Sequence, residues 1–89
     1  MIDEQVQKDS LRRLKKIEGQ VKGIQRMVEQ RKYCIDIINQ ITAVRRALDV
    51  VSLKVMRRHL QSCVTEAIKQ NRPQEKIDEL METIYKFVK

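Results

Sequence analysis

The chain has 89 residues, of which 42% are hydrophobic and 35% charged, with two glycines, one proline, two cysteines and a net charge of +7 at pH 7. This length predicts one domain, residues 1–89, and the composition predicts an all-helical fold without a disulfide framework. Because neither a secretory leader nor an apolar run of ~18 residues is visible, we expect a cytoplasmic protein that does not insert into a membrane.

The first predicted helix runs from Asp3 or Glu4 to about Gln30. Its apolar positions repeat every three or four residues, as expected for packing against another helix: Leu14, Ile17, Val21, Ile24 and Val28. A basic stripe without interleaved acids follows the opposite face: Lys8, Arg12, Lys15, Lys22 and Arg26. Gly19 and Gly23 lie inside the helix, where each costs about 1 kcal/mol relative to alanine, so we expect close helix packing or a backbone contact there.

The second predicted helix begins near residues 32–34 and runs without a breaker to about Lys69. Its apolar positions follow the same spacing: Ile37, Ile41, Val44, Leu48, Val51 and Val55. The break before it, at residues 30–32, is weakly marked, because it holds neither glycine nor proline. The break after it, at residues 71–73, is clear, and Pro73 suits the first turn of a third helix.

Charge is unevenly distributed along the chain. Residues 1–33 carry nine basic and five acidic side chains (+4), residues 34–72 carry seven and three (+4), and residues 73–89 carry three and four (−1). The first two thirds therefore predict a surface for a polyanion. A solvated helical surface with no such partner is the alternative.

Two cysteines and the only histidine form the most informative pattern. His59 and Cys63 are four residues apart, which places them on one helical face within reach of one metal ion. Cys34 lies 25 residues before His59, or about 37 Å along a continuous helix, so it cannot join them within one chain. It can do so if two copies of the second helix pack antiparallel about a two-fold axis between Ala47 and Leu48, which creates two identical sites.

Two thiolates and one imidazole suit Cu(I) or zinc better than magnesium, calcium or manganese. Three ligands complete a trigonal Cu(I) site, whereas structural zinc generally takes four. The alternative is that both cysteines are small core residues and the histidine is a surface group. An enzyme is not expected, because the sequence holds no phosphate-binding glycine loop, no Ser-His-Asp set and no paired carboxylates in a predicted cleft.

The chain resembles the copper-sensing operon repressor (CsoR) family, within a superfamily that includes nickel/cobalt, formaldehyde and persulfide sensors. The resemblance spans the chain and lies in three segments: residues 11–24 (LRRLKKIEGQVKGI), 33–44 (YCIDIINQITAV) and 59–63 (HLQSC). It implies a three-helix protomer with a long second helix, an antiparallel four-helix-bundle dimer core, and a dimer of dimers.

The resemblance also implies the site. Cu(I), one per subunit, is bound by Cys34 of one subunit with His59 and Cys63 of the next. Tyr33 and Glu79 match positions that hydrogen-bond the outer nitrogen of the histidine. The other branches use further histidines, an N-terminal proline or no histidine, and this chain has only His59 and Pro73.

The resemblance implies a repressor that binds double-stranded operator DNA when metal-free and releases it on binding Cu(I), which allows transcription of copper export genes. Arg13 matches a DNA-contact position of the family. A second basic position falls on Val50, where a neighbouring cation would have to replace it. The DNA candidates are Lys8, Arg12, Arg13, Lys15, Lys16, Arg45, Arg46 and Lys54. A copper chaperone is a further candidate partner. The alternative function is a persulfide or disulfide sensor of the same fold, for which His59 would be dispensable.

Overall fold

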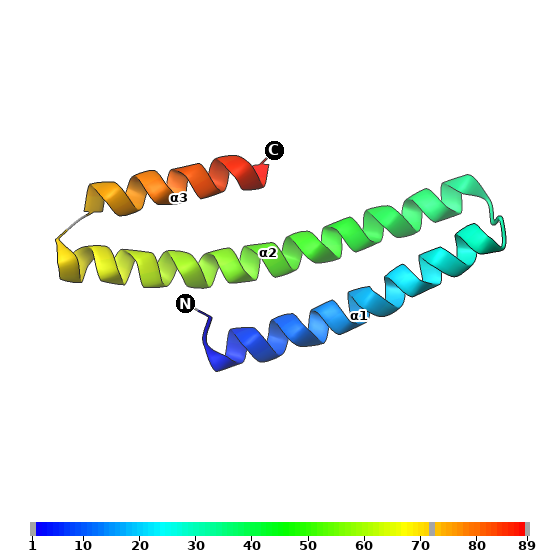
Figure 1. The fold of residues 1–89 in the computed structure, drawn as a ribbon, viewed down its shortest axis with the longest axis horizontal. Helices are drawn as coiled ribbons and strands as arrows, with labels where there is room; N and C mark the ends of the chain where they lie inside the picture. The colour runs from blue at the N-terminus through cyan, green and yellow to red at the C-terminus, as the bar shows by residue number, and fades with distance from the viewer. Residues whose placement is uncertain (1, 72, 89) are drawn as a thin grey trace. The chain divides into compact units, whose positions relative to one another are not determined.

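The computed structural model describes residues 2–71 and 73–88, which form three helices: α1 (Glu4–Glu29), α2 (Cys34–Gln70) and α3 (Pro73–Val88) (Figure 1). The predicted all-α class is confirmed, and the predicted bounds of α1 and α2 and the predicted start of α3 agree with the structure to within about one residue. Contacts divide the chain into an N-terminal unit, Ile2–Val55, and a C-terminal unit that begins at Met56. α2 contributes to both units.

The start of α1 is fixed by a capping side chain. Asp3 has an extended backbone, and its Oδ1 accepts a hydrogen bond of 2.8 Å from the backbone N–H of Val6. Such a cap satisfies one of the unpaired donors of the first helical turn, typically for about 1 kcal/mol. Glu4 adds an acid in that turn, where the helix dipole favours negative charge.

The end of α1 lacks the glycine that usually marks the end of a helix in a sequence. The N–H of Lys32 donates to the carbonyl of Met27 at 3.0 Å, and the N–H of Arg31 donates to the carbonyl of Val28 at 3.1 Å. This is the Schellman pattern, whose penultimate residue adopts a left-handed conformation and is usually glycine. Here it is Arg31, with φ of 54°. The chain therefore turns without a residue that favours the turn.

α2 is 37 residues long and ends at Gln70. Asn71, with φ of 56°, follows it in the left-handed region, which asparagine tolerates better than most residues. α3 begins at Pro73, as predicted. Arg72, which was also expected in this break, lies outside the described residues.

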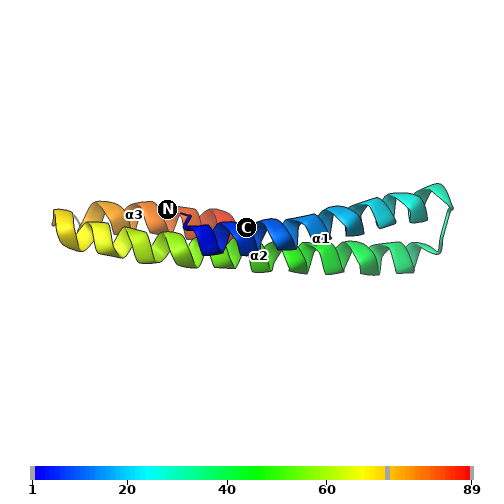
Figure 2. The same ribbon diagram turned by 90° about the horizontal axis from the view of Figure 1, so that it is seen from below.

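In the N-terminal unit, α1 lies antiparallel to the first half of α2 (Figures 1 and 2). Ile17, Val44 and Val51 are the buried core of this pair. Ile24, Ala47 and Val55 are partly buried against them. All of these positions except Ala47 belong to the predicted apolar seams, so the helices pack inside the unit with the predicted helical spacing.

Only part of each apolar seam is covered inside the N-terminal unit. Ile37 is half-buried, and the other positions of both seams are exposed: Leu14 (40%), Val21 (41%), Val28 (57%), Ile41 (43%) and Leu48 (42%). They alternate along each helix with the buried positions at heptad spacing, so α1 and α2 present a second apolar surface. Among the described residues no large side chain is fully buried.

In the C-terminal unit, α3 lies antiparallel to the second half of α2 (Figure 2). Cys63 and Ala67 are buried here, at 6% and 8% exposure. Within the described residues, no helix is both long and apolar enough to cross a membrane.

The prediction of close packing at the two glycines is wrong for the protomer. A Cβ placed on Gly19 would meet no atom within 4 Å, and one on Gly23 would meet only the side chain of Arg26, at 3.7 Å. Neither glycine has a positive φ. Within one chain both positions could hold alanine.

Candidate metal centre

His59 and Cys63 lie one helical turn apart on α2, inside the C-terminal unit. The imidazole is half-buried and the thiol is buried. Cys63 Sγ is 4.0 Å from the backbone carbonyl of Lys76 on α3, a weak hydrogen-bond distance for sulfur. The pair is thus held where α2 is covered by α3.

Cys34 is in a different setting. It is the first residue of α2, it belongs to the N-terminal unit, and its thiol is exposed and not in a disulfide. Across residues 2–71 and 73–88, no three His, Cys, Asp or Glu side chains are grouped so that they could hold one metal ion. One protomer therefore does not assemble the three predicted ligands.

A cavity of about 410 Å³ opens beside the buried thiol. Its wall is formed by α2 and α3, within the C-terminal unit, and is largely apolar: Cys63, Val64, Ala67, Ile68, Ile77 and Leu80. Burial of Cys63 therefore does not mean that its surroundings are filled. A side chain from outside the protomer has room to approach this thiol.

Lys76 is a charged contact that the sequence did not single out. Its Nζ lies 3.7 Å from Glu66 Oε2 on α2 and 3.9 Å from Glu79 Oε2 on α3. Its backbone carbonyl is the one that faces Cys63. The spacing to Glu79 was readable as an i,i+3 pair, but the contact with Glu66 depends on how α3 packs on α2.

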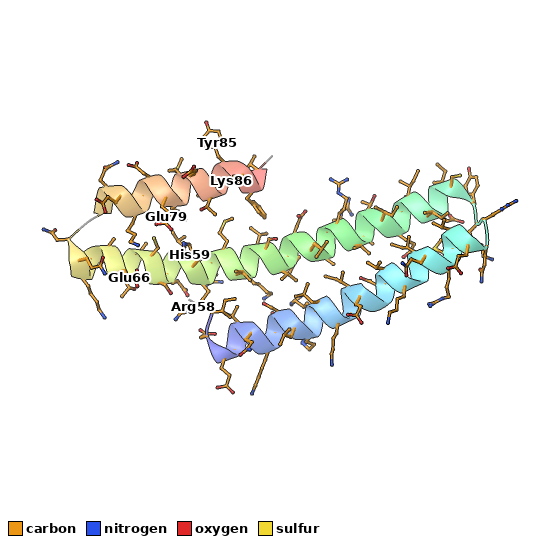
Figure 3. All side chains as sticks on the ribbon, in the orientation of Figure 1. Arg58, His59, Glu66, Glu79, Tyr85 and Lys86 are labelled. Atoms are coloured by element: carbon orange, nitrogen blue, oxygen red, sulfur yellow. The ribbon has the colours of Figure 1, made fainter. Side chains whose placement is uncertain are left out.

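Glu79 and Tyr33 lie on different elements. Figure 3 shows Glu79 on the side of α3 that faces α2, at the level of His59. In the described part of the chain, Glu79 is paired with Lys76 and makes no hydrogen bond to His59. Tyr33 immediately precedes α2, the residue is 69% exposed, and its carbonyl accepts a hydrogen bond of 3.2 Å from the N–H of Ile37.

The basic stripe of α1 is not free of acids, contrary to the prediction. Three of its cations are paired with acids three or four residues earlier on the same helix: Lys8 with Glu4 (3.1 Å), Arg12 with Asp9 (2.7 Å) and Lys22 with Glu18 (3.7 Å). The i,i+3 and i,i+4 spacings could have been read from the sequence. Lys15, Lys16, Arg45 and Arg46 are exposed, and within the described ranges no ion pair involves them.

Asp9 links α1 to α2 through the predicted DNA candidates. Arg13 Nε donates to Asp9 Oδ2 at 3.0 Å, and Lys54 Nζ on α2 lies 3.8 Å from the same oxygen. The hydrogen bonds from Arg12 and Arg13 lower the pKa of the Asp9 carboxyl below its ordinary value. Arg12, Arg13 and Lys54 are therefore gathered on one surface of the N-terminal unit.

Comparison with known proteins gives one family. Residues 6–86 match the family described as metal-sensitive transcriptional repressor. The copper-sensing transcriptional repressor CsoR of Bacillus subtilis (strain 168) is 48% identical over 77 residues, which cover 86% of this chain and 76% of that protein. The copper-sensing transcriptional repressor RicR of Mycobacterium tuberculosis (strain H37Rv) is 50% identical over 68 residues, covering 75% and 71%.

Solved structures agree with this family. The copper-sensing repressor CsoR with Cu(I) from Geobacillus thermodenitrificans NG80-2 matches with a TM-score of 0.88 and 40% identity, over 100% of this chain and 93% of that one. The nickel-responsive transcriptional regulator InrS matches with a TM-score of 0.82 and 31% identity, over 90% of each chain. Both copper- and nickel-responsive proteins therefore share this fold, and the ligand set must distinguish them.

Proposed function

Because this chain belongs to the metal-sensitive transcriptional repressors, we propose that it is a Cu(I)-responsive repressor. It binds operator DNA when metal-free and releases it when Cu(I) binds, so that copper export or resistance genes are transcribed. The observation that carries this proposal is the Cys-His-Cys donor set of Cys34, His59 and Cys63. Relatives at 48% and 50% identity carry copper-sensing names, which supports the same metal here.

The donor chemistry fits Cu(I). Thiolates and an imidazole are ligands that Cu(I) accepts, and three of them complete a trigonal site. Cys63 is buried beside a cavity, and His59 is half-buried one turn away, so the pair is partly shielded from water. Cys34 is exposed and thus available to another subunit.

The proposed site is shared between subunits. Cys34 of a second copy joins His59 and Cys63, with one Cu(I) per subunit bridging the two chains. The absence of a three-ligand group within the described residues of one protomer supports this arrangement. The exposed apolar positions of α1 and α2 supply the interface of a four-helix dimer core, and two such dimers form the tetramer.

Release of DNA requires that the metal site and the DNA surface be coupled. Cu(I), when bound, would link two subunits through their thiolate and imidazole ligands. Glu79 then has two competing partners, Lys76 on its own helix and the outer nitrogen of His59 on α2. Transfer of Glu79 to His59, with Tyr33 as a further hydrogen-bond partner of that ring, would reposition α3 against α2. Such outer hydrogen bonds orient a metal-binding ring.

Operator DNA is proposed to bind the cationic surface of the N-terminal unit. Arg13 is the principal candidate, accompanied by Lys8, Arg12, Lys15, Lys16, Arg45, Arg46 and Lys54. Contacts of this kind to phosphate make binding strongly dependent on salt. The protein would act in the cytoplasm and could receive its copper from a chaperone.

The test is an anaerobic Cu(I) titration of the reduced protein against bathocuproine, with DNA binding followed on the duplex upstream of its own gene. We expect one tightly held Cu(I) per subunit and a roughly 5- to 150-fold loss of DNA affinity at that stoichiometry. Variants C34S, H59A and C63S should each abolish tight binding and the response, whereas S62A, beside Cys63, should change neither.

The thiol-sensing alternative predicts a different outcome. Weak Cu(I) binding, DNA release only after oxidant or sulfide, and an H59A variant that still responds would together make Cys34 and Cys63 a redox pair. Double variants at Tyr33 and Glu79 test the relay separately. If they bind Cu(I) and still release DNA as the wild type does, the proposed relay is wrong.

A further inference from the structure

One carboxylate lies among three cations on the N-terminal unit. We call this group the Asp9 cluster: Asp9, Arg12 and Arg13 on α1, and Lys54 on α2. Asp9 Oδ1 accepts from Arg12 Nη2 at 2.7 Å, and Oδ2 is 3.0 Å from Arg13 Nε and 3.8 Å from Lys54 Nζ. The cluster carries a net charge of +2, and its acid occupies donors that come from two helices.

The cations of the Asp9 cluster are more accessible than the acid. The side chain of Asp9 is 28% exposed, whereas those of Arg12, Arg13 and Lys54 are 71%, 36% and 43% exposed. A phosphate oxyanion can therefore approach these donors from solvent. Guanidinium and ammonium groups that bind a carboxylate also bind phosphate, because both are oxyanions with similar acceptor geometry.

Resting on the DNA-binding function proposed above, we propose that Asp9 is an internal competitor of the DNA backbone. Its carboxylate occupies the donors of Arg12, Arg13 and Lys54 until a phosphate replaces it, and this lowers the affinity of the protein for DNA of any sequence. Lys54 is then the α2 residue of the phosphate-binding surface. It would replace the basic residue that the family resemblance places at position 50, where this chain has Val50.

The strength of the cluster suits such an exchange. Ion pairs between exposed side chains contribute little, because solvent screens them and the side chains lose freedom when they pair. The carboxylate is charged at neutral pH, since the hydrogen bonds from Arg12 and Arg13 favour its ionised form. The ionised Asp9 carboxylate thus competes with phosphate for the same cationic donors, but its ion pairs are weak enough for phosphate to displace it. It also keeps three flexible cations on one surface.

The experiment compares D9N with E29Q. Both substitutions remove one negative charge from α1 and keep the size of the side chain. Glu29 lies about 30 Å further along the helix, well beyond the screening length of about 10 Å at 0.1 M salt. DNA binding by metal-free full-length protein is measured by fluorescence anisotropy on the upstream duplex and on a duplex of unrelated sequence.

We expect D9N to bind both duplexes about three- to tenfold more tightly than the wild type at about 50 mM salt. One additional effective phosphate contact makes the slope of log K against log salt more negative by about 0.9. The advantage of D9N should therefore shrink about threefold between about 50 and about 200 mM salt. E29Q should follow the wild type in both affinity and slope.

A second pair of variants tests the assignment of Lys54. K54Q should weaken binding to both duplexes and make the slope less negative by about 0.9, whereas K86Q, which removes the same charge from α3, should not. Thermal unfolding of each variant controls for loss of structure. If folded K54Q binds like K86Q, Lys54 is not part of the surface.

The outcomes separate this inference from the function on which it rests. Wild type that binds DNA and releases it with Cu(I), beside D9N that matches E29Q or binds more weakly, overturns the role of Asp9 alone. Wild type that binds neither duplex overturns both. Tighter binding by D9N with the steeper salt dependence supports both the competitor and the DNA surface.

Discussion

At the scale of the residue, several cationic side chains of this protein are already paired with a carboxylate of the same chain. Lys8, Arg12 and Lys22 look like free cations in the sequence, yet each lies within 4 Å of an acid in the structure. Lys76 is likewise placed between Glu66 and Glu79. The availability of a cation to DNA, and of Glu79 to His59, therefore depends on which ion pair must first be broken.

Asp9 should make the stability of the protein depend on pH. Its pKa is lower in the folded chain than in the unfolded chain, because Arg12 and Arg13 hydrogen-bond the ionised form. This contribution is complete above the unfolded value of about 3.9 and is lost as pH falls through the folded pKa. We expect the difference in urea midpoint between wild type and D9N to be constant from about pH 5 to 7 and to shrink below about pH 4. If the difference in urea midpoint persists below about pH 4, the stabilisation by Asp9 comes from packing and not from its charge.

Lys76 should restrain the response to copper. K76M keeps the length of the side chain but removes the charge that pairs with both Glu66 and Glu79, so Lys76 no longer competes with His59 for Glu79. We expect Cu(I) affinity to rise by up to about fivefold, the upper range for an ion pair that is at least partly solvated. K86M, on the same helix, is the matched control. Competition titration with bathocuproine measures the Cu(I) affinity of both variants. An unchanged affinity in K76M would show that the ion pair of Lys76 does not oppose copper binding.

At the scale of the element, the least favourable backbone conformation lies at the end of α1. Its last hydrogen bonds require a left-handed residue, and that residue is Arg31. A side chain with a Cβ is strained there by roughly 1 kcal/mol. The strain persists because the antiparallel pair of α1 and α2 fixes where the chain must turn.

R31G should therefore stabilise the protein. Glycine adopts a positive φ without strain, although it also increases the entropy of the unfolded chain. We expect a net gain of about 0.5–1 kcal/mol in the free energy of unfolding. Q30G, at the neighbouring residue with φ of −84°, should destabilise the protein, since no strain is relieved there. Chemical denaturation of both variants measures the contrast, and equal effects would contradict it.

At the scale of the whole molecule, one protomer leaves much of its apolar surface uncovered. Ile17, Val44 and Val51 are buried between α1 and α2, while Leu14 and Leu48 on the same two helices are exposed. A chain of this size with so small a core is expected to gain stability from association. The same association would bring Cys34 to the thiol and imidazole of another copy.

L48E tests this assembly. In an antiparallel pair of α2 helices about the proposed two-fold axis, position 48 lies next to its own copy, so two introduced carboxylates would repel each other across an apolar interface. We expect a lower mass by light scattering and loss of tight Cu(I) binding in the same variant. N39E, about 180° around α2 from Leu48, should retain both. A tetrameric L48E that binds copper would exclude the proposed axis.

The three helices, the bounds of the first two and the Cys-His-Cys pattern could be read from the sequence alone, because helical periodicity, proline position and i,i+4 spacing are local properties. The sequence also determined the family, through three segments that span the chain. Three features required the folded structure: which positions of each apolar seam are buried, the pairing of Asp9 with both Arg13 and Lys54, and the contact of Lys76 with both Glu66 and Glu79. Those facts depend on how α1 and α3 pack on α2, which brings together residues that are distant in sequence. The cavity beside Cys63 also required the folded structure, because it lies between α2 and α3.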